Sequence, residues 1–329
     1  MLGLFLMATQ SRAQSCSGNL QPAFWKQTFG KGANPGPGLP PGKTNYTYTT
    51  DPCPPEGYYT IVHSTGGCGA NNWNPLDVCC TPGDTNGYMM LVNASETAGD
   101  VYVDTARDLC GSTNFQLSFT VANLSKAASC GGHPLPPDLL FSVETPSGTV
   151  INSGRTGTLD FDFSSDIFSL YFRTPDAVTS VVVRIATANA GGCGNDFILD
   201  DIEIGACGPL VSAGMVVSPG NFNPYINRCV GDPSPLSLSA SVGTGYMAPY
   251  YQWQFYNGLE WIDIGGAIAP DYSFTAPQAT GTFKYRLSVA EAANISSHNC
   301  RVVSNEVTVS ILQPTMLITA GSNSPVCEN

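Results

Sequence analysis

Charge is scarce in this 329-residue chain, and one sign dominates what there is. Charged residues make up 12% of the sequence, with 13 Lys and Arg against 25 Asp and Glu and a formal net charge of −12. Nucleic acids and anionic membrane surfaces bind basic proteins, because Lys and Arg neutralise phosphate groups. The composition therefore argues against both as partners, and it suits an exported protein or one that collects divalent cations.

Apolar runs long enough to span a bilayer are also lacking. Residues 1–7 form an apolar stretch, but a membrane-spanning helix needs about 20 such residues. Small residues at Ser11 and Ala13 precede Gln14 in the manner of a signal-peptidase site. We predict that residues 1–13 are a signal peptide and that the mature chain is secreted or displayed on the outer cell surface without inserting into a membrane. The absence of a basic segment before the apolar stretch leaves open whether the natural start lies upstream of Met1.

Enzymatic motifs are absent as well. The sequence has no HExxH, no GxSxG, no P-loop and no GxGxxG opening a helix. Acidic pairs among Asp160, Asp162 and Asp166 could be imagined as glycosidase carboxylates. Acidic side chains in the turns of an acidic β-protein are usually solvated, so we interpret the chain as non-catalytic.

Histidine is rare, with three residues, whereas there are twelve cysteines. None of the cysteines forms the paired CxxC knuckles of a zinc site, so the pattern predicts disulfides in an exported chain. We predict a bond between Cys130 and Cys193, which both lie in Gly-rich turns. Two further predicted pairs join the ends of domains or strands: Cys229 with Cys300, and Cys16 with Cys207. The remaining pairings in the first domain stay open.

Amphipathic helical segments of useful length are missing, while 35 glycines and 25 prolines supply many turns. Short alternating or apolar segments between these turns predict β-strands. Eight or more short antiparallel strands in one domain, residues 14–208, imply a two-sheet sandwich. The strands expected there are 58–64, 87–93, 100–105, 114–123, 138–145, 167–174, 179–187 and 197–204.

A second domain is expected at residues 209–314. Its expected strands are 236–242, 250–256, 282–290 and 302–312. Trp253 lies in the middle of one of them, which resembles the immunoglobulin-like sandwich. We interpret Trp253 and Trp261 as core residues. The segment around Cys327 echoes the approach to Cys229, so residues 315–329 are predicted to begin a further repeat that continues beyond Asn329.

Four stretches carry a family resemblance: FGKGANPGPGLPPGKTNYTY, PPEGYYTIVHST, GDTNGYMMLVNAS and GGCGNDFILDDIEIGACGP. Together they resemble the N-terminal jelly-roll domain of large secreted Bacteroidetes cell-surface proteins, which carry immunoglobulin-like or PKD-like repeats after it. The resemblance implies a galactose-binding-like jelly roll followed by an immunoglobulin-like sandwich, and an adhesive or sugar-binding role.

A structural calcium ion is the cofactor we expect. Alternation along residues 197–204 places Asp200 on the same face as Ile198, Ile202 and Ile204, where a bare carboxylate would be costly to bury. Calcium takes six or more oxygen ligands. The candidate ligands are Asp200, Asp201, Asp84 and Asn86. The resemblance supports this, since similar jelly-roll sugar-binding modules hold calcium between first and last strands. The alternative is that Asp84 and Asn86 form an Asx-turn.

Aromatic side chains suggest where a glycan could bind, because sugar rings stack on aromatic faces. Most aromatics in a sandwich are core residues. Trp73 is the exception we favour, because it lies among Asn71, Asn72 and Asn74 in a Gly-rich loop. Trp73, Asn72, Tyr46 and Tyr48 are therefore the predicted ligand-binding residues.

The sequence predicts a non-catalytic, exported surface protein that binds an extracellular glycan or a surface protein through its first domain. Immunoglobulin-like repeats would then serve as spacers. The alternative is a carbohydrate-binding module of a polysaccharide-degrading enzyme whose catalytic domain lies beyond Asn329.

Overall fold

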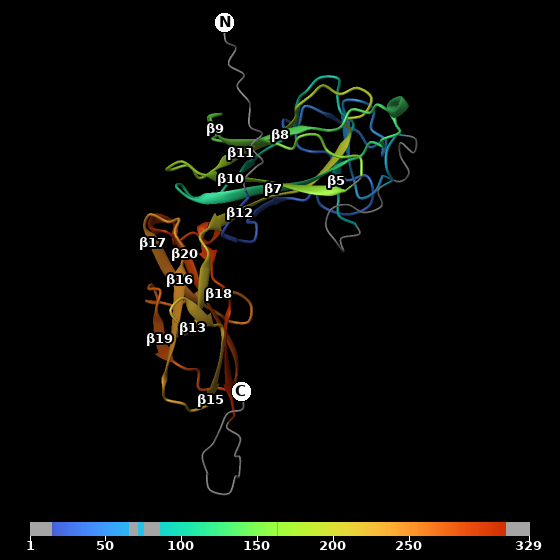
Figure 1. Ribbon diagram of the computed structural model, residues 1–329. Coiled ribbons are helices and arrows are strands. Elements are labelled where there is room, and N and C mark those ends of the chain that lie inside the picture. Colours follow the sequence, from blue (N-terminus) through green and yellow to red (C-terminus); the bar gives the residue numbers. More distant parts are fainter. Residues whose placement is uncertain (1–14, 66–71, 76–85, 163, 314–329) are drawn as a thin grey trace. The chain divides into compact units, whose positions relative to one another are not determined.

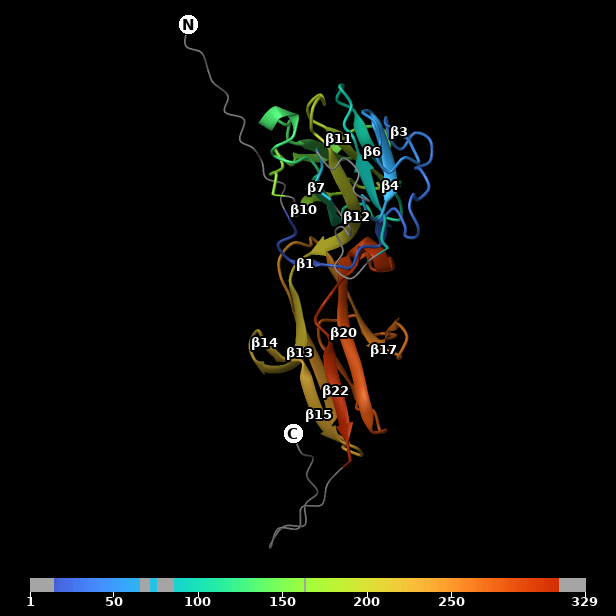
Figure 2. The same cartoon turned by 90° about the vertical axis from the view of Figure 1, so that its right-hand side faces the viewer.

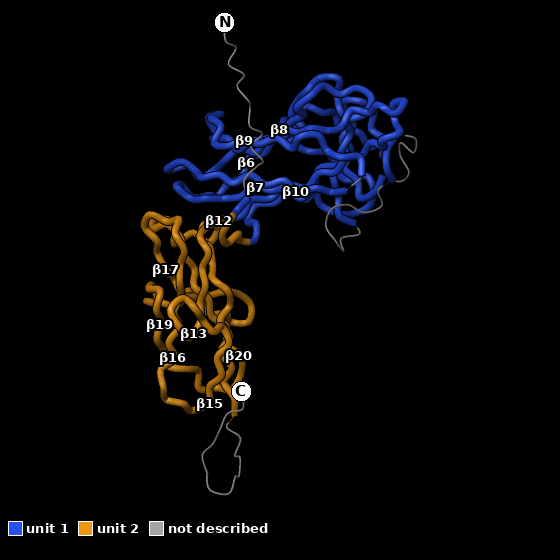
Figure 3. The backbone as a smooth tube through the Cα atoms, viewed as in Figure 1, with its two compact units in different colours: residues 1–16, 22–205 blue, residues 17–21, 206–329 orange. Residues whose placement is uncertain are grey.

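The computed structural model describes residues 15–65, 72–75, 86–162 and 164–313, and the predicted all-β class is confirmed (Figure 1). The chain divides into two compact units (Figure 3). The first unit contains Pro22–Gly205 together with Cys16, and the second contains Ser17–Gln21 and the chain from Ala206 onward. The division falls just before the boundary predicted at residue 208. The predicted signal peptide and the predicted start of a further repeat lie outside the described residues.

The first unit is a two-sheet sandwich. One sheet has the order β10-β7-β12-β5-β4-β3, and β2 also pairs with β12. β1 pairs with residues 207 and 208 at the end of β12, and these paired segments belong to the second unit. The other has the order β6-β11-β8-β9. Figure 1 shows β8, β9 and β11 in one layer and β5, β7 and β10 in the other. The strands of the larger sheet are β1 (Asn19–Leu20), β2 (Trp25–Gln27), β3 (Thr47–Tyr48), β4 (Tyr58–Val62), β5 (Met89–Val92), β7 (Asn114–Asn123), β10 (Ser165–Arg173) and β12 (Phe197–Gly208). Those of the smaller sheet are β6 (Asp100–Ala106), β8 (Leu139–Glu144), β9 (Val150–Arg155) and β11 (Val181–Thr187).

Alternation along these strands builds the core between the two sheets. Phe115, Leu117, Phe119 and Val121 of β7 are all buried. Phe119 meets Phe141 of β8 edge to face, with ring centroids 5.1 Å apart. Such aromatic pairs add about 1 kcal/mol beyond the area they bury. The two facing sheets therefore share one aromatic core, as the predicted jelly-roll sandwich requires.

The second unit is the predicted immunoglobulin-like sandwich. Its sheets have the orders β14-β13-β16-β19 and β15-β22-β20-β17-β18, with β21 also paired to β20. Figure 2 shows β13 beside β20 and β22. The strands are β13 (Val211–Ser218), β14 (Asn221–Asn223), β15 (Tyr225–Cys229), β16 (Pro235–Val242), β17 (Pro249–Tyr256), β18 (Trp261–Asp263), β19 (Tyr272–Thr275), β20 (Gly281–Glu291), β21 (Val302–Val303) and β22 (Val307–Leu312). Three single-turn 3₁₀ helices complete the described elements of the chain: η1 (Cys130–Gly132), η2 (Ala292–Asn294) and η3 (His298–Cys300).

The two tryptophans of the second unit have different environments. Trp253 is fully buried in the core cluster, and its indole Nε1 donates to the Ala269 carbonyl at 3.0 Å, so the core prediction for it is confirmed. Trp261 lies outside that cluster and is only half-buried. In the ladder it lies opposite Tyr256, two residues from buried Gln254 along β17, on the outer face of the sheet. The core interpretation of Trp261 is wrong because β18 is an edge strand that turns this side chain outward.

All eight cysteines that the structure describes are disulfide-bonded. The predicted bond between Cys130 and Cys193 is present, with Cα atoms 5.6 Å apart. The pairing of Cys16 with Cys207 stays a prediction.

The strand register argues against the predicted pairing of Cys229 with Cys300. Cys229 is opposite Leu312, at the end of the sheet where β20 begins. Cys300 comes just before Val302, which is opposite Val289 near the other end of β20. At about 3.3 Å per residue the two ends are roughly 25 Å apart, whereas the Cα atoms of a disulfide lie within about 7 Å. Each cysteine therefore bonds elsewhere, which sequence spacing alone could not reveal.

Candidate functional site

A pocket of about 350 Å³ lies in the first unit where several loops meet. Neighbouring strands of the larger sheet run in opposite directions here, so β5 and β7 end at the same end of the sheet at which β4 and β12 begin. The segments that lead into and out of these strands therefore converge there. The lining residues are Cys53, Glu56, Asn72, Trp73, Asn93, Ser129, Cys130, Gly192, Cys193, Gly194 and Asp196. They come from five segments that are distant in sequence.

Trp73 and Asn72 reach this pocket through a short strand-like pairing. The Asn74 amide donates to the Leu124 carbonyl at 2.8 Å, and the Lys126 amide donates to the Asn72 carbonyl at 2.7 Å. Trp73 forms an isolated bridge with Ser125 between these two bonds. Side chains alternate in an extended segment, so Asn72 points out while Trp73 points in.

The prediction that Trp73 is an exposed stacking platform is therefore wrong. Its side chain is 6% exposed and packs in a cluster with Val62, Met89, Leu91, Ala122, Leu124 and Ile198. Only part of the indole borders the pocket. Asn72, by contrast, is exposed and lines the pocket, and its role in ligand binding stays a prediction.

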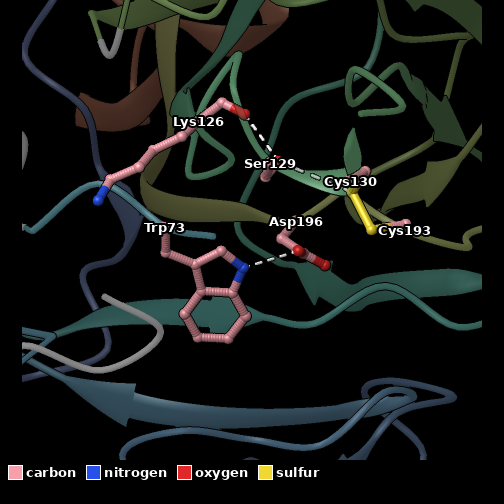
Figure 4. Close-up of a disulfide and its surroundings, with 6 residues drawn as sticks. All are labelled: Trp73, Lys126, Ser129, Cys130, Cys193 and Asp196. Carbon is pink, nitrogen blue, oxygen red and sulfur yellow. Dashed lines mark hydrogen bonds between the residues drawn. A yellow bond between two sulfur atoms is a disulfide. The ribbon is translucent and has the colours of Figure 1, made fainter. Parts of the chain in front are cut away.

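Asp196 is the buried polar group of the pocket (Figure 4). The Trp73 indole Nε1 donates to Oδ2 at 2.7 Å, and the Ala94 amide donates to Oδ1 at 3.1 Å. Burial raises the pKa of Asp196 to about 6, although both donors oppose the rise, and the charge of Glu56 adds to it. A carboxylate has about four lone-pair positions, so each oxygen can accept a further bond from a ligand hydroxyl.

A disulfide-bonded pair of Gly-rich loops forms one wall of the pocket. Figure 4 shows the Cys130–Cys193 bond beside Asp196. The Leu135 amide donates to the Cys193 carbonyl at 3.0 Å, and the Asn195 amide donates to the Leu135 carbonyl at 2.6 Å. Gly194 has φ 102°, and a Cβ there would lie 2.7 Å from the Leu135 carbonyl oxygen, so only glycine fits. The cross-link and this close backbone contact hold the wall in one conformation.

Glu56 and Asn93 supply further polar side chains that the sequence analysis did not single out. Glu56 is exposed at the pocket. Asn93 directly follows β5, and its Nδ2 donates to the Pro54 carbonyl at 2.9 Å. Neither residue carries a local motif that would mark it, because only the sheet register brings them together. Asp196 lies in the GGCGNDFILDD stretch, directly before the strand predicted at 197–204.

The two predicted tyrosines are not open platforms for a sugar ring. Tyr46 is 7% exposed, and its hydroxyl oxygen lies 3.5 Å from the Ser95 amide that donates to it. The Tyr48 hydroxyl donates to the Gly36 carbonyl at 2.5 Å, and a Cβ on Gly38 would lie 2.6 Å from the ring. The segment that contains Gly36 and Gly38 therefore covers Tyr48. Both predictions are wrong, because Tyr46 is buried beside Ser95 and Tyr48 is covered by this segment.

The calcium prediction remains a prediction. Asp84 lies outside the described residues, and within the described ones no group of three or more His, Cys, Asp or Glu is placed to hold a metal. Asp201 has φ 47°, so the uninterrupted alternation predicted across Asp200 is wrong. Asp200 is nevertheless buried, and its Oδ1 accepts the Asp201 amide at 2.8 Å. Asn86 is exposed, and its carbonyl accepts the Gly32 amide at 3.1 Å.

Asp196 predicts a distinctive pH response. Its folded pKa of about 6 exceeds the ordinary 3.8, so the native state binds the proton more tightly. The contribution of Asp196 to the free energy of unfolding therefore rises as the pH falls through 6. It reaches its full value, up to about 3 kcal/mol, below the pKa of the unfolded state. Unfolding titrations at pH 7 and pH 4 should show this gain in the wild type relative to Asp196→Asn. Asp162→Asn is the control, since donors from Ser164 lower the pKa of Asp162 and give the opposite sign. A midpoint near pH 4 in a carboxyl NMR titration of Asp196 would contradict the raised pKa and the pH response that follows from it.

No family model matches the chain. No curated protein matches it either. Among solved structures, the chain is similar to the CBM22-1 xylan-binding domain of Paenibacillus barcinonensis Xyn10C, at 10% identity and TM-score 0.32, over 59% of this chain and 97% of that one. It is also similar to the EclA C-terminal domain, a sugar-binding protein, at 14% identity and TM-score 0.26, over 33% and 69% of the two chains. A family 16 carbohydrate-binding module matches at 16% identity and TM-score 0.25, over 38% and 79%. Similarity at these TM-scores does not establish a shared function.

Across the part of the chain that the structure describes, no helix is both long enough and apolar enough to cross a bilayer.

Proposed function

We propose that the first unit is a glycan-binding module and that the pocket beside Asp196 is its ligand site. The observation that carries the proposal is the convergence of two carboxylates and two carboxamides, from Glu56, Asp196, Asn72 and Asn93, on one pocket with an aromatic edge. Binding sites combine a concave surface with a few polar groups that fix orientation. Carboxylates and carboxamides accept and donate pairs of hydrogen bonds, which suits the adjacent hydroxyls of a sugar ring.

The rigidity of the wall supports binding rather than mere packing. A ligand loses less free energy when the site does not have to become ordered on association. The disulfide between Cys130 and Cys193 and the backbone bonds of Leu135 provide that order before a ligand arrives. Asp196 is held by two donors, so its oxygens face a defined direction.

We propose that the module belongs to an exported surface protein and acts in adhesion without catalysis. Disulfides persist in oxidising compartments, and all described cysteines are bonded, which supports export. The pocket fits equally well a carbohydrate-binding module of a polysaccharide-degrading enzyme. The gene sequence beyond Asn329 distinguishes these: further immunoglobulin-like repeats support adhesion, and a hydrolase domain supports the enzyme. We also propose that a structural calcium ion binds near Asp200, which does not line this pocket.

Asn72→Ala should weaken glycan binding about fivefold, the effect of one lost hydrogen bond of about 1 kcal/mol. The side chain is exposed, so the fold should not change. A glycan array probed with the whole chain would identify a binding sugar, and calorimetry would then compare the variants. Asn227→Ala, at an exposed position in β15, is the matched control and should bind as the wild type does. Equal affinities for all three proteins would exclude the pocket, and an array without any binder would exclude the function.

A further inference from the structure

The outer face of the β20-β17-β18 sheet in the second unit carries an ordered row of aromatic and charged side chains. Arg286, Gln254 and Asp263 are opposite one another across the three strands, and Tyr256 is opposite Trp261. The Tyr256 and Trp261 ring centroids are 5.3 Å apart. The Arg286 guanidinium carbon lies 4.2 Å from the centroid of the Trp261 ring. These residues, Gln254, Tyr256, Trp261, Asp263 and Arg286, are called the outer-face cluster below.

Hydrogen bonds fix the guanidinium of Arg286 in one orientation. Arg301 donates to both oxygens of Asp263, at 2.7 and 2.9 Å. An ionised carboxylate only accepts, so the Gln254 Nε2 must face Asp263, to which it donates at 2.8 Å. The Gln254 Oε1 then faces Arg286 and accepts from its Nε at 2.8 Å. Because Gln254 is 1% exposed, its side-chain amide has no room to flip and exchange Oε1 with Nε2.

Arg286 differs from the other basic residues of the second unit. Within the described residues, Arg228, Lys284 and Arg301 each form an ion pair with a carboxylate, and Arg286 has none. Its Nε donates to Gln254 and its guanidinium carbon lies over the Trp261 ring, and the N–H groups of Nη1 and Nη2 have no described acceptor. Burial lowers the pKa of Arg286 to about 10, although the charges of Glu306 and Asp263 oppose the fall, so the group is charged at neutral pH. A planar guanidinium fork of this kind matches a carboxylate bidentately.

We propose that the outer-face cluster is a second ligand site, which takes the carboxylate of an acidic sugar such as a uronic acid. The Nη1 and Nη2 groups of Arg286 would hold the carboxylate. Tyr256 is 37% exposed, and with the half-buried Trp261 it offers ring surface beside the carboxylate for the pyranose ring. A sugar fits better than an acidic peptide because the aromatic surface adjoins one cation that forms no ion pair with a described carboxylate, whereas a run of acidic residues needs several cations. This site is separate from the pocket of the first unit and does not depend on it.

The test is calorimetric titration of the whole chain with oligomers of galacturonate, glucuronate and mannuronate, each alongside its methyl ester. We expect at least one free acid to bind and its ester to bind at least about tenfold more weakly, as the loss of a charge-assisted pair implies. Arg286→Gln should weaken binding of the acid to the same degree. Arg286→Lys keeps the charge but not the fork, so it should also lose most of the affinity.

Lys284→Gln is the matched control, because it removes one positive charge two residues away on the same strand and should change affinity less than about twofold, as expected of an exposed pair. Asn72→Ala should leave uronate binding unchanged, which separates this site from the pocket. Circular dichroism checks that each variant is folded. The proposal is overturned if no uronate binds, if acid and ester bind alike, if Arg286→Lys and Arg286→Gln both bind as the wild type does, or if hexaglutamate binds more tightly than every uronate.

Discussion

Replacing both Cys130 and Cys193 by Ala should lower the free energy of unfolding of the first unit by about 4 kcal/mol. The bond closes a loop with a sequence separation of 63 residues. In the chain-entropy model, opening a loop of this size restores about 14 cal/mol/K to the unfolded chain, which is about 4 kcal/mol at 25 °C. Ala is preferred to Ser because it adds no hydroxyl that would need a partner in the half-buried position of Cys130.

The same substitution should also weaken glycan binding. Cys130 has φ 56° and is followed by Gly131 at φ 69° and Gly132 at φ 86°, a conformation that the cross-link helps to hold. Without the bond, this part of the pocket wall must become ordered when a ligand binds. Denaturant titration of the whole chain would measure the stability, and the slope of the transition should increase as the unfolded state expands.

Two outcomes would contradict the expected loss of stability and the expected loss of glycan affinity, respectively. An unfolding free energy within about 1 kcal/mol of the wild type would show that strain or residual structure cancels the entropic gain. Unchanged glycan affinity in a destabilised variant would show that backbone bonds alone, such as that from Leu135 to Cys193, hold the wall.

The sequence was sufficient to predict the sandwich because alternation is a local signal. The 114–123 strand has the bounds that the sequence predicts, and the strand predicted at 179–187 is β11 (Val181–Thr187), interior to its sheet. Strand β9 (Val150–Arg155) was missed because its face is mostly exposed and shows little apolar periodicity. Strand β12 extends to residue 208, beyond the predicted end at 204, because Gly205–Gly208 continues to pair, with β1 opposite Cys207 and Gly208.

The site was predicted only in part, because register and burial are not local signals. Asn72 was identified from its Gly-rich surroundings, and Cys130 with Cys193 from their Gly-rich turns. Trp73 was misjudged because composition suggested a surface loop, whereas Asn72, Trp73 and Asn74 alternate polar and apolar as an extended segment does. That short alternation was the available signal. Nothing local could show that Glu56 and Asn93 approach Asp196, since sheet pairing alone connects them.

Trp73→Ala should be among the most destabilising single substitutions in the first unit. Removing a buried aromatic side chain costs about 3–5 kcal/mol. The loss of the Nε1 donor also leaves Asp196 with one fewer bond, which costs a further 1–3 kcal/mol, approximately. Trp261→Ala is the matched control in the second unit, and it should cost less than half as much because Trp261 is half-buried on an outer face.

Trp73→Phe isolates the hydrogen bond from the packing. Phenylalanine fills most of the space among Val62, Met89 and Leu91 but cannot donate to Asp196, so we expect a loss of about 1–3 kcal/mol at neutral pH. The indole donor favours the ionised carboxylate, so its removal should raise the pKa of Asp196 above the present value of about 6. As the pH falls towards 4 and the carboxyl becomes protonated, the difference in stability from the wild type should shrink, because the missing donor matters most to the charged form.

Carboxyl NMR of Trp73→Phe would measure the midpoint of the Asp196 titration directly. A midpoint equal to that of the wild type would mean that the indole does not bond the carboxylate in solution, and the fixed orientation of Asp196 in the pocket would then rest on the Ala94 amide alone.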